Sequence, residues 1–175
     1  MGPWGHARVR IRRVTATRLV WHTPRRGRCR RCRRTQVLLH VAGYPRRPDS
    51  AETIGVALLA AARGADHRSI ATDLDLPATT VRGWLRRARV NAEPARVAAT
   101  LAAHDLDPLC RPIPPTGSSL GDMVEALGRA VQAWILRLGP GPPWQLAVLC
   151  TGARILAPPI RRSGGRTSRA YQTRP

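Results

Sequence analysis

Apolar and polar residues alternate with a period of two in the first part of the chain. Val9 and Ile11 lie between arginines, and Leu19 and Trp21 repeat the same alternation further along. A period of two is typical of β-strands, because successive side chains of a strand point to opposite faces. A glycine and two prolines then end this part of the chain. The pattern predicts a β-rich arm over residues 1–48.

The spacing changes to that of helices from Asp49 onward. Asp49 and Glu52 have the spacing of a capping box, in which each side chain accepts a hydrogen bond from a free backbone N–H group. This box predicts the start of a helix, and Gly64 is placed to end it. Asp66 is a good N-cap for a second, short helix, which Pro77 ends.

A third helix is predicted from about residue 78 to 90. Its apolar residues recur at the i, i+3, i+4, i+7 spacing of one helix face, namely Val81, Trp84, Leu85 and Ala88. The second and third helices also have the apolar order of a helix-turn-helix, with Ile70, Ala71, Leu74, Leu76, Val81 and Trp84. Asp75 occupies the turn position where glycine is usual, and aspartate tolerates the left-handed backbone conformation that the turn requires.

The outward face of this third helix is the predicted DNA-reading surface. The helix carries four arginines and no acid, whereas its partner helix carries Asp73. Threonine and arginine side chains commonly read base edges in the major groove. The predicted DNA-binding residues are Ala78, Thr79, Arg82, Gly83, Arg86, Arg87 and Arg89. In the alternative interpretation, three amphipathic helices simply pack as a bundle and the arginines form a solvated face.

The C-terminal half is less regular. An alanine-rich stretch followed by a proline-rich one predicts a linker over residues 93–117. Residues 119–138 have a strongly amphipathic helical pattern, which the Gly-Pro run at 139–143 ends. Residues 144–156 form a final apolar element that the pattern leaves open as a helix or a strand, and residues 158–175 are predicted to be disordered.

The charge of the chain is large and unevenly distributed. The formal net charge is +20, and all 30 basic residues are arginine. Residues 1–48 contain 14 arginines and no acid, residues 49–110 contain 7 arginines and 8 acids, and residues 111–175 contain 9 arginines and 2 acids. A basic arm and a basic tail therefore flank a balanced middle region, which favours a polyanionic partner such as nucleic acid. No apolar run is long enough to span a membrane.

Cys29 and Cys32 form a C-x2-C pair with the spacing of a zinc knuckle. A structural zinc site needs four ligands, and His6, His22 and His40, the candidates in this region, have no partner at ligand spacing. The pair is thus a candidate metal site that is incomplete, and we expect no cofactor unless zinc is bound. Cys110 and Cys150 stand among apolar residues and are predicted to be buried, inert thiols, and this cysteine usage favours the reducing cytoplasm.

These motifs resemble a family. The runs Arg28–Leu39, Ser50–Gly55, Ile70–Leu74 and Thr80–Leu85 are similar to uncharacterised helix-turn-helix proteins of GC-rich bacteria. Those proteins resemble the N-terminal part of insertion-sequence transposases, in which a zinc ribbon precedes a DNA-recognising helical domain. Weaker similarity extends over Ser118–Leu138, Pro143-Trp144 and Thr151-Gly152. The resemblance implies duplex DNA as the partner.

The sequence departs from the family pattern at its N-terminus. The family has an earlier C-x2-C pair upstream of a segment like Pro3–Arg8, and this chain begins at that segment. Either the start codon is placed too late or the gene is truncated, and in the second case zinc binding would be lost.

We expect no catalytic activity. An active transposase needs clustered carboxylates to hold two metal ions, and the ten acids fall mostly at predicted caps, turns and polar helix faces. No phosphate-binding loop, nucleophile elbow or metalloprotease motif is present. The alternatives to a DNA-binding protein are an interaction protein that dimerises through the helix at 119–138, or a non-functional fragment of a mobile-element protein.

The sequence therefore predicts a mainly α fold: a trihelical helix-turn-helix domain with a β-rich, partial zinc-ribbon-like N-terminal arm and a C-terminal amphipathic helical segment. The predicted protein is transposase-like or regulatory, lies in the cytoplasm at the nucleoid, and is associated with no membrane. The predicted divisions are a basic arm (1–48), a helix-turn-helix domain (49–92), a linker (93–117), a helical or apolar segment (118–157) and a disordered basic tail (158–175).

Overall fold

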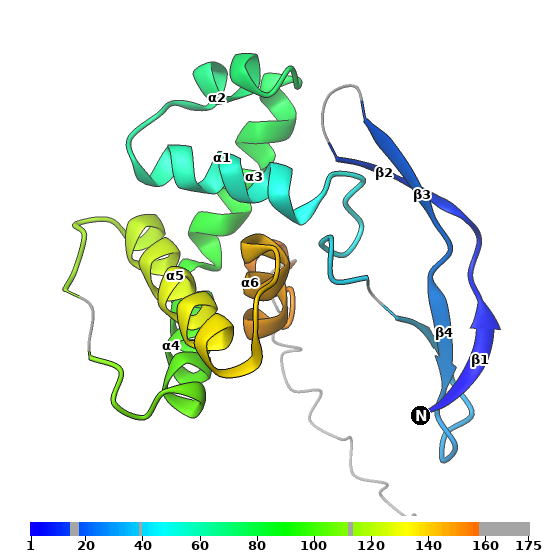
Figure 1. The fold of residues 1–175 in the computed structure, drawn as a ribbon. Helices are drawn as coiled ribbons and strands as arrows, with labels where there is room; N and C mark the ends of the chain where they lie inside the picture. Colours follow the sequence, from blue (N-terminus) through cyan, green and yellow to red (C-terminus); the bar gives the residue numbers. More distant parts are fainter. Residues whose placement is uncertain (15–17, 39, 112–113, 158–175) are drawn as a thin grey trace, which may run out of the picture.

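The computed structural model describes residues 1–14, 18–38, 40–111 and 114–157 of the 175-residue chain. About half of the chain is helical, and small antiparallel sheets complete a mixed α/β structure. Figure 1 shows the helices gathered in one body, with the strands of the arm along one side. The predicted disordered tail lies outside the described residues.

The arm contains five strands, and two of them, β2 (Arg10–Arg13) and β3 (Leu19–His22), lie where the alternating pattern predicts strands. Strands β1, β4 and β5 form one antiparallel sheet in that order, and β2 pairs with β3 in a separate hairpin. In this hairpin Ile11 lies opposite Trp21, so both apolar side chains are on the same face. The strands are β1 (Gly2–His6), β2 (Arg10–Arg13), β3 (Leu19–His22), β4 (Arg25–Arg28) and β5 (Thr35–Val37).

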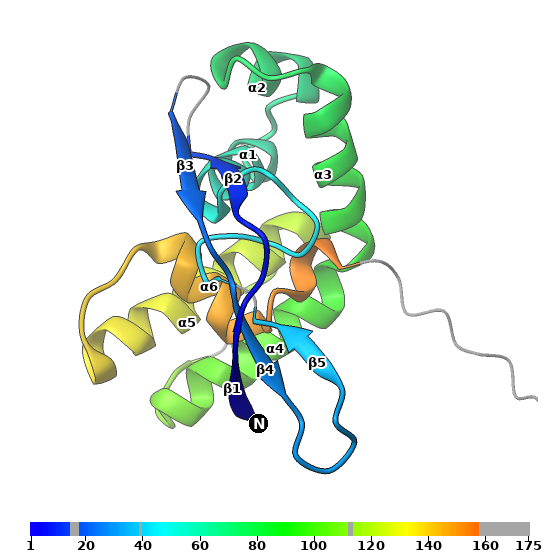
Figure 2. The same cartoon turned by 90° about the vertical axis from the view of Figure 1, so that its right-hand side faces the viewer.

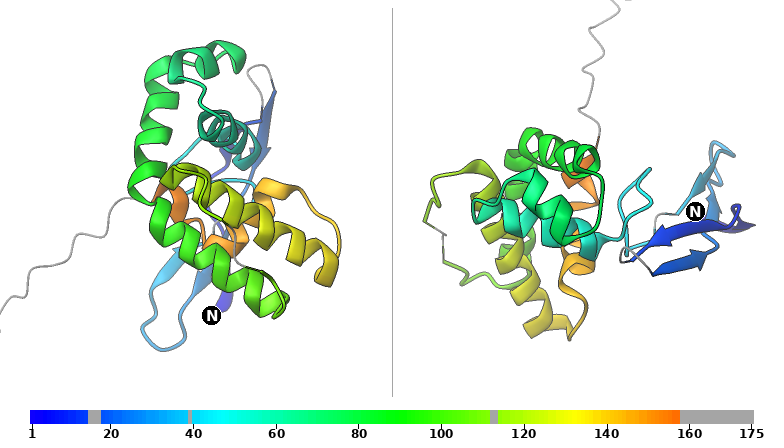
Figure 3. Two further views of the ribbon diagram at one scale, coloured as in Figure 1. Left: turned by 90° about the vertical axis from the view of Figure 1, so that its left-hand side faces the viewer. Right: turned by 90° about the horizontal axis from the view of Figure 1, so that it is seen from above.

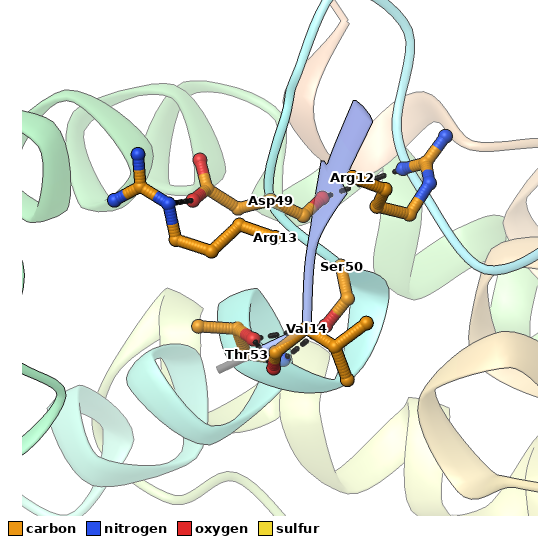
Figure 4. Close-up of polar contacts among 6 residues, drawn as sticks. All are labelled: Arg12, Arg13, Val14, Asp49, Ser50 and Thr53. Carbon is orange, nitrogen blue, oxygen red and sulfur yellow. Dashed lines mark hydrogen bonds and ion pairs between the residues drawn. The ribbon is translucent and has the colours of Figure 1, made fainter. Parts of the chain in front are cut away.

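Polar contacts fasten the end of β2 to the start of the first helix (Figure 4). The Arg13 Nε atom lies 3.6 Å from a carboxylate oxygen of Asp49, and Arg12 Nη1 donates to the Asp49 carbonyl oxygen at 3.4 Å. The Thr53 hydroxyl donates to the carbonyl oxygen of Val14 at 2.7 Å. The arm is therefore held against the helical body at this point, although Figure 3 shows that most of it stands to one side.

Helix α1 (Ala51–Ala62) begins one residue later than the predicted capping box implies. Ser50 is the N-cap, and its hydroxyl accepts a hydrogen bond from the Thr53 N–H group at 3.0 Å. Asp49 is not the cap, because its side chain is turned toward Arg13 and is almost completely buried. This burial raises the pKa of Asp49, and the nearby Arg13 guanidinium opposes the rise.

Helices α2 (His67–Asp73) and α3 (Ala78–Val90) follow the predicted boundaries closely. The Asp66 carboxylate accepts hydrogen bonds from two N–H groups of the first turn of α2, which confirms it as the N-cap. Asp75 adopts the left-handed conformation with φ of 50°, as the turn between the two helices requires. The predicted apolar face of α3 is buried throughout, at Val81, Trp84, Leu85 and Ala88.

The predicted linker over residues 93–117 is wrong in its first half. Residues 92–106 form helix α4 (Ala92–Leu106), which packs closely against α5 (Ser119–Leu138). The buried face of α4 consists of alanines at helical spacing, namely Ala92, Ala95, Ala99 and Ala103. Small side chains allow two helices to approach closely, and α5 contributes three buried alanines of its own.

The final apolar element is a helix, α6 (Pro143–Thr151), followed by a short 3-10 turn, η1 (Arg154–Leu156). Trp144 of α6 packs directly on Gly55 of α1, where an added Cβ atom would lie 1.9 Å from the indole ring. The Glu52 carboxylate of α1 lies near the start of α6, where the backbone N–H groups of Gln145 and Trp144 act to lower its pKa. Burial nevertheless raises the pKa of Glu52.

One apolar core runs through the described helices. It takes side chains from every helix and also from the arm segment, through Tyr44, which is 1% exposed. The predicted boundaries therefore need revision, because the arm at 1–48 supplies a core residue, and the regions at 49–92 and 118–157 share a single core. Asn91 adds a polar tie, since its side-chain amide donates to the carbonyl oxygens of Ile155 and Ala157.

Candidate nucleic-acid interface

Helix α3 presents a basic face to solvent on the side opposite its buried face. The side chains of Thr79, Arg82, Arg86 and Arg89 are exposed. Because a helix turns 100° per residue, residues 79, 82, 86 and 89 fall on the same side of the helix. Figure 2 shows α3 along one edge of the helical body, where neighbouring helices do not cover its outer side.

The other three predicted DNA-binding residues lie at the margin of this face. Ala78, Gly83 and Arg87 are partly buried. The Arg87 guanidinium donates to the carbonyl oxygen of Gly83 at 3.1 Å, so its side chain runs back along the helix toward the arm. Arg87 therefore faces a different neighbourhood from Arg82 and Arg86, and the seven predicted residues do not form one uniform surface.

Two arginines that the sequence analysis did not assign to the site lie beside α3. Arg13, at the end of β2, and Arg47, shortly before α1, line a cleft together with Arg87. In the sequence they are separated from α3 by more than thirty residues, and no local pattern connects them to it. The available signal was the absence of acids from residues 1–48, which contain Arg13 and Arg47, and from α3, which contains Arg87.

The cysteine pair forms a tight turn between β4 and β5. The Cys29 N–H group donates to the Arg34 carbonyl oxygen at 2.9 Å, and the Arg33 N–H group donates to the Cys29 carbonyl oxygen at 3.0 Å. Hydrogen bonds from the Cys32 N–H group, the Cys32 thiol and the Arg31 N–H group lower the pKa of Cys29. The turn therefore favours a thiolate at Cys29, as a metal ligand requires.

The remaining zinc ligands are missing from the part of the chain that the structure describes. No group of three or more histidine, cysteine or acidic side chains lies close enough there to hold a metal ion. The rings of His22 and His40 pack edge to face, with centroids 5.7 Å apart, and they belong to no such group. The residues present do not fit a four-ligand zinc site. Burial raises the pKa of the Cys150 thiol, and Cys110 is partly buried.

We expect the purified chain to bind zinc weakly and at less than one equivalent, because two ligands cannot replace the four of a structural site. Metal analysis after dialysis against a mild chelator measures this, with the Cys29→Ser/Cys32→Ser double variant as the control for binding elsewhere. One tightly held zinc per chain, lost in the double variant, would contradict the expectation.

Most of the apolar stripe of the helix at 119–138 is buried inside the chain. Its residues Leu120, Met123 and Leu127 are buried against other helices of the same chain. Exposed apolar side chains remain near its C-terminal end, at Leu136 and Leu138. The predicted homodimer rested on an exposed apolar stripe, and these buried residues do not provide one.

Comparison with known protein families, curated proteins and solved structures gives no match to this chain. Among the helices that the structure describes, none combines the length and the apolar character that crossing a bilayer demands.

Proposed function

We propose that the chain is a DNA-binding protein in which α2, the turn at Asp75 and α3 act as a helix-turn-helix, with α3 entering the major groove. The observation that carries the proposal is the two-sided character of α3. One side is fully buried and apolar, whereas the exposed side offers threonine and arginine side chains with no acid in the helix. Groove insertion requires a helix of this kind, held rigidly and electropositive on its outer face.

Further support comes from the arm and from the charge distribution. The arm contributes 14 arginines without an acid, and counterion release from such a segment gives binding that does not depend on sequence. In this proposal α3 determines which DNA sequence is bound, and the arm increases the affinity for any DNA sequence. The proposed role is transposase-like targeting or regulation, with no catalytic site, and the proposed location is the cytoplasm at the nucleoid.

Replacing Arg82 or Arg86 by alanine is expected to leave the fold intact and to change DNA recognition. Both side chains are exposed, so neither supports the core. Each replacement should cost about 1–3 kcal/mol on the preferred site and relax the choice at one or two base pairs. Selection of bound sequences from a random duplex library, followed by affinity measurements, tests this.

Arg137→Ala is the matched control, because it removes one exposed arginine from α5, away from the proposed interface. The control should keep the sequence preference of the parent. If Arg82→Ala and Arg86→Ala also bind every sequence as the parent does, α3 is not in the groove, and the helices form a bundle with a solvated basic face.

A further inference from the structure

A cleft of about 280 Å³ opens between the arm and the N-terminal half of α3. Three arginines from separate segments line it: Arg13 from the end of β2, Arg47 from the segment before α1, and Arg87 from α3. Thr79 and Thr80 of the first turn of α3 also line the cleft. Basic and hydroxyl groups from three parts of the chain thus converge on one space.

The charges in the cleft are not balanced by the protein. Asp49 is the single carboxylate among the described residues that line it, and Asp49 is paired with Arg13. Asp49 also attracts Arg47, so three guanidinium groups share one carboxylate in the cleft. Burial, and then the proximity of Arg87, lower the pKa of Arg47, which means that the protein holds two guanidinium groups near each other at a cost. The buried Nε atom of Arg47 makes no hydrogen bond.

The groups that line the cleft also suit an anion. Pro77, the N-cap of α3, offers no side-chain acceptor to the N–H groups of the first turn, and the positive end of a helix attracts anions. Gly83 lines the cleft without a side chain. The space beside it is open, because a Cβ atom added there would contact only the Arg87 guanidinium, at 3.5 Å. Guanidinium groups, hydroxyls and free N–H groups are the donors that phosphate binds.

We infer that this cleft binds a backbone phosphate of the duplex whose groove α3 enters. The inference rests on the proposed function, because it assigns the ligand of a surface directly beside the exposed face of α3. A phosphate held there fixes the depth and register of α3 in the groove, as backbone contacts do in other protein–DNA interfaces. It also couples the arm to α3, since the duplex would join Arg13 and Arg47 to Arg87.

The test combines a protein variant with a DNA variant. A duplex that the parent protein prefers is prepared as a set in which one phosphate at a time is replaced by a neutral methylphosphonate. The inference predicts one position at which neutralisation weakens the parent about tenfold but leaves the Arg47→Ala variant unchanged. Arg47→Ala should also bind all sequences about tenfold more weakly, with unchanged preference, and its slope of log affinity against log salt should fall by about 0.9.

Arg46→Ala is the matched control, because Arg46 is the neighbouring exposed arginine and does not line the cleft. This control should keep the penalty at the sensitive phosphate. Thermal melts of both variants show whether the fold persists. If Arg47→Ala unfolds, Arg47→Lys is the second variant, because it keeps the positive charge. Arg47→Lys should lose only part of the penalty at the sensitive phosphate.

Two results would overturn the inference. In the first, Arg47→Ala keeps every phosphate penalty of the parent, as Arg46→Ala does. In the second, the DNA-free protein binds inorganic phosphate and Arg47→Ala abolishes this binding, but Arg47→Ala changes the penalty at no phosphate of the duplex. The cleft would then be a site for free phosphate. Failure of the proposed function looks different, because then Arg82→Ala leaves the sequence preference unchanged whatever Arg47→Ala does.

Discussion

Replacing Trp84 by alanine is expected to cost about 3–5 kcal/mol of unfolding free energy, a large share of the roughly 5–15 kcal/mol that keeps a typical protein folded. The Trp84 side chain is 2% exposed and belongs to the core that α1, α2 and α3 share. Removing the indole leaves a cavity that the surrounding helices cannot fill. Urea unfolding followed by circular dichroism measures the change, and DNA binding should be lost together with the helical signal.

Trp21→Ala is the control for this experiment, because Trp21 is 68% exposed on the β2–β3 hairpin. It removes the same side chain from a solvated position and should change stability by less than about 1 kcal/mol. If Trp84→Ala were as stable as Trp21→Ala, the packing of α3 described here would be wrong, and the face assigned to DNA would have to be reassigned with it.

A comparable loss, about 3–5 kcal/mol, is expected for Tyr44→Ala, whereas Tyr44→Phe should be neutral or stabilising. Tyr44 is 1% exposed, and its hydroxyl is buried without a hydrogen-bond partner. Burial raises the pKa of this hydroxyl far above its ordinary value, and the negative charge of Glu52 raises it further. The ring therefore stabilises the core, and the hydroxyl contributes nothing that phenylalanine lacks.

The paired variants separate these two roles of Tyr44. Urea unfolding of both proteins gives the comparison directly, since they differ in the ring and the hydroxyl at one position. A Tyr44→Phe variant that loses more than about 1 kcal/mol would mean that the hydroxyl does have a partner, such as Glu52 or a bound water. If Tyr44→Ala were as stable as the parent, the arm segment would not be part of the core.

The elements with strong periodicity could be predicted from the sequence. The face of α3 follows from four apolar residues at helical spacing, and the turn follows from Asp75, whose side chain tolerates positive φ. Strands β2 and β3 of the arm follow from alternation between apolar and polar residues. In each case the signal lies within a few residues of the element that it specifies.

Other features depend on partners that are distant in the sequence. Alanine contrasts little with its neighbours in hydrophobicity, so the buried alanines of α4 gave no apolar stripe, and the helix was mistaken for a linker. Asp49 and Ser50 are both good N-caps, and the choice between them depends on Arg13, which reaches Asp49 from the arm. Tyr44 lies among glycine and prolines that indicate a linker, and only the assembled helices bury it.

The candidate site divides in the same way. The exposed residues of α3 could be predicted, because the buried face of a helix determines the opposite one. The cleft could not, since Arg13, Arg47 and Arg87 meet only after the arm has docked against α1. Arg87 was accordingly grouped with the groove-facing residues, although its side chain turns toward the arm.

The alanine-lined contact between α4 and α5 limits how this protein can vary. Where two helices approach over methyl groups, each added methylene forces the helices apart, so Ala95, Ala99 and Ala103 can be exchanged for little besides glycine or serine. The exposed side of α4, which includes Leu101, carries no such restriction. Tolerance to substitution along α4 should therefore rise and fall with the helical period, in a stretch where hydrophobicity alone shows no period.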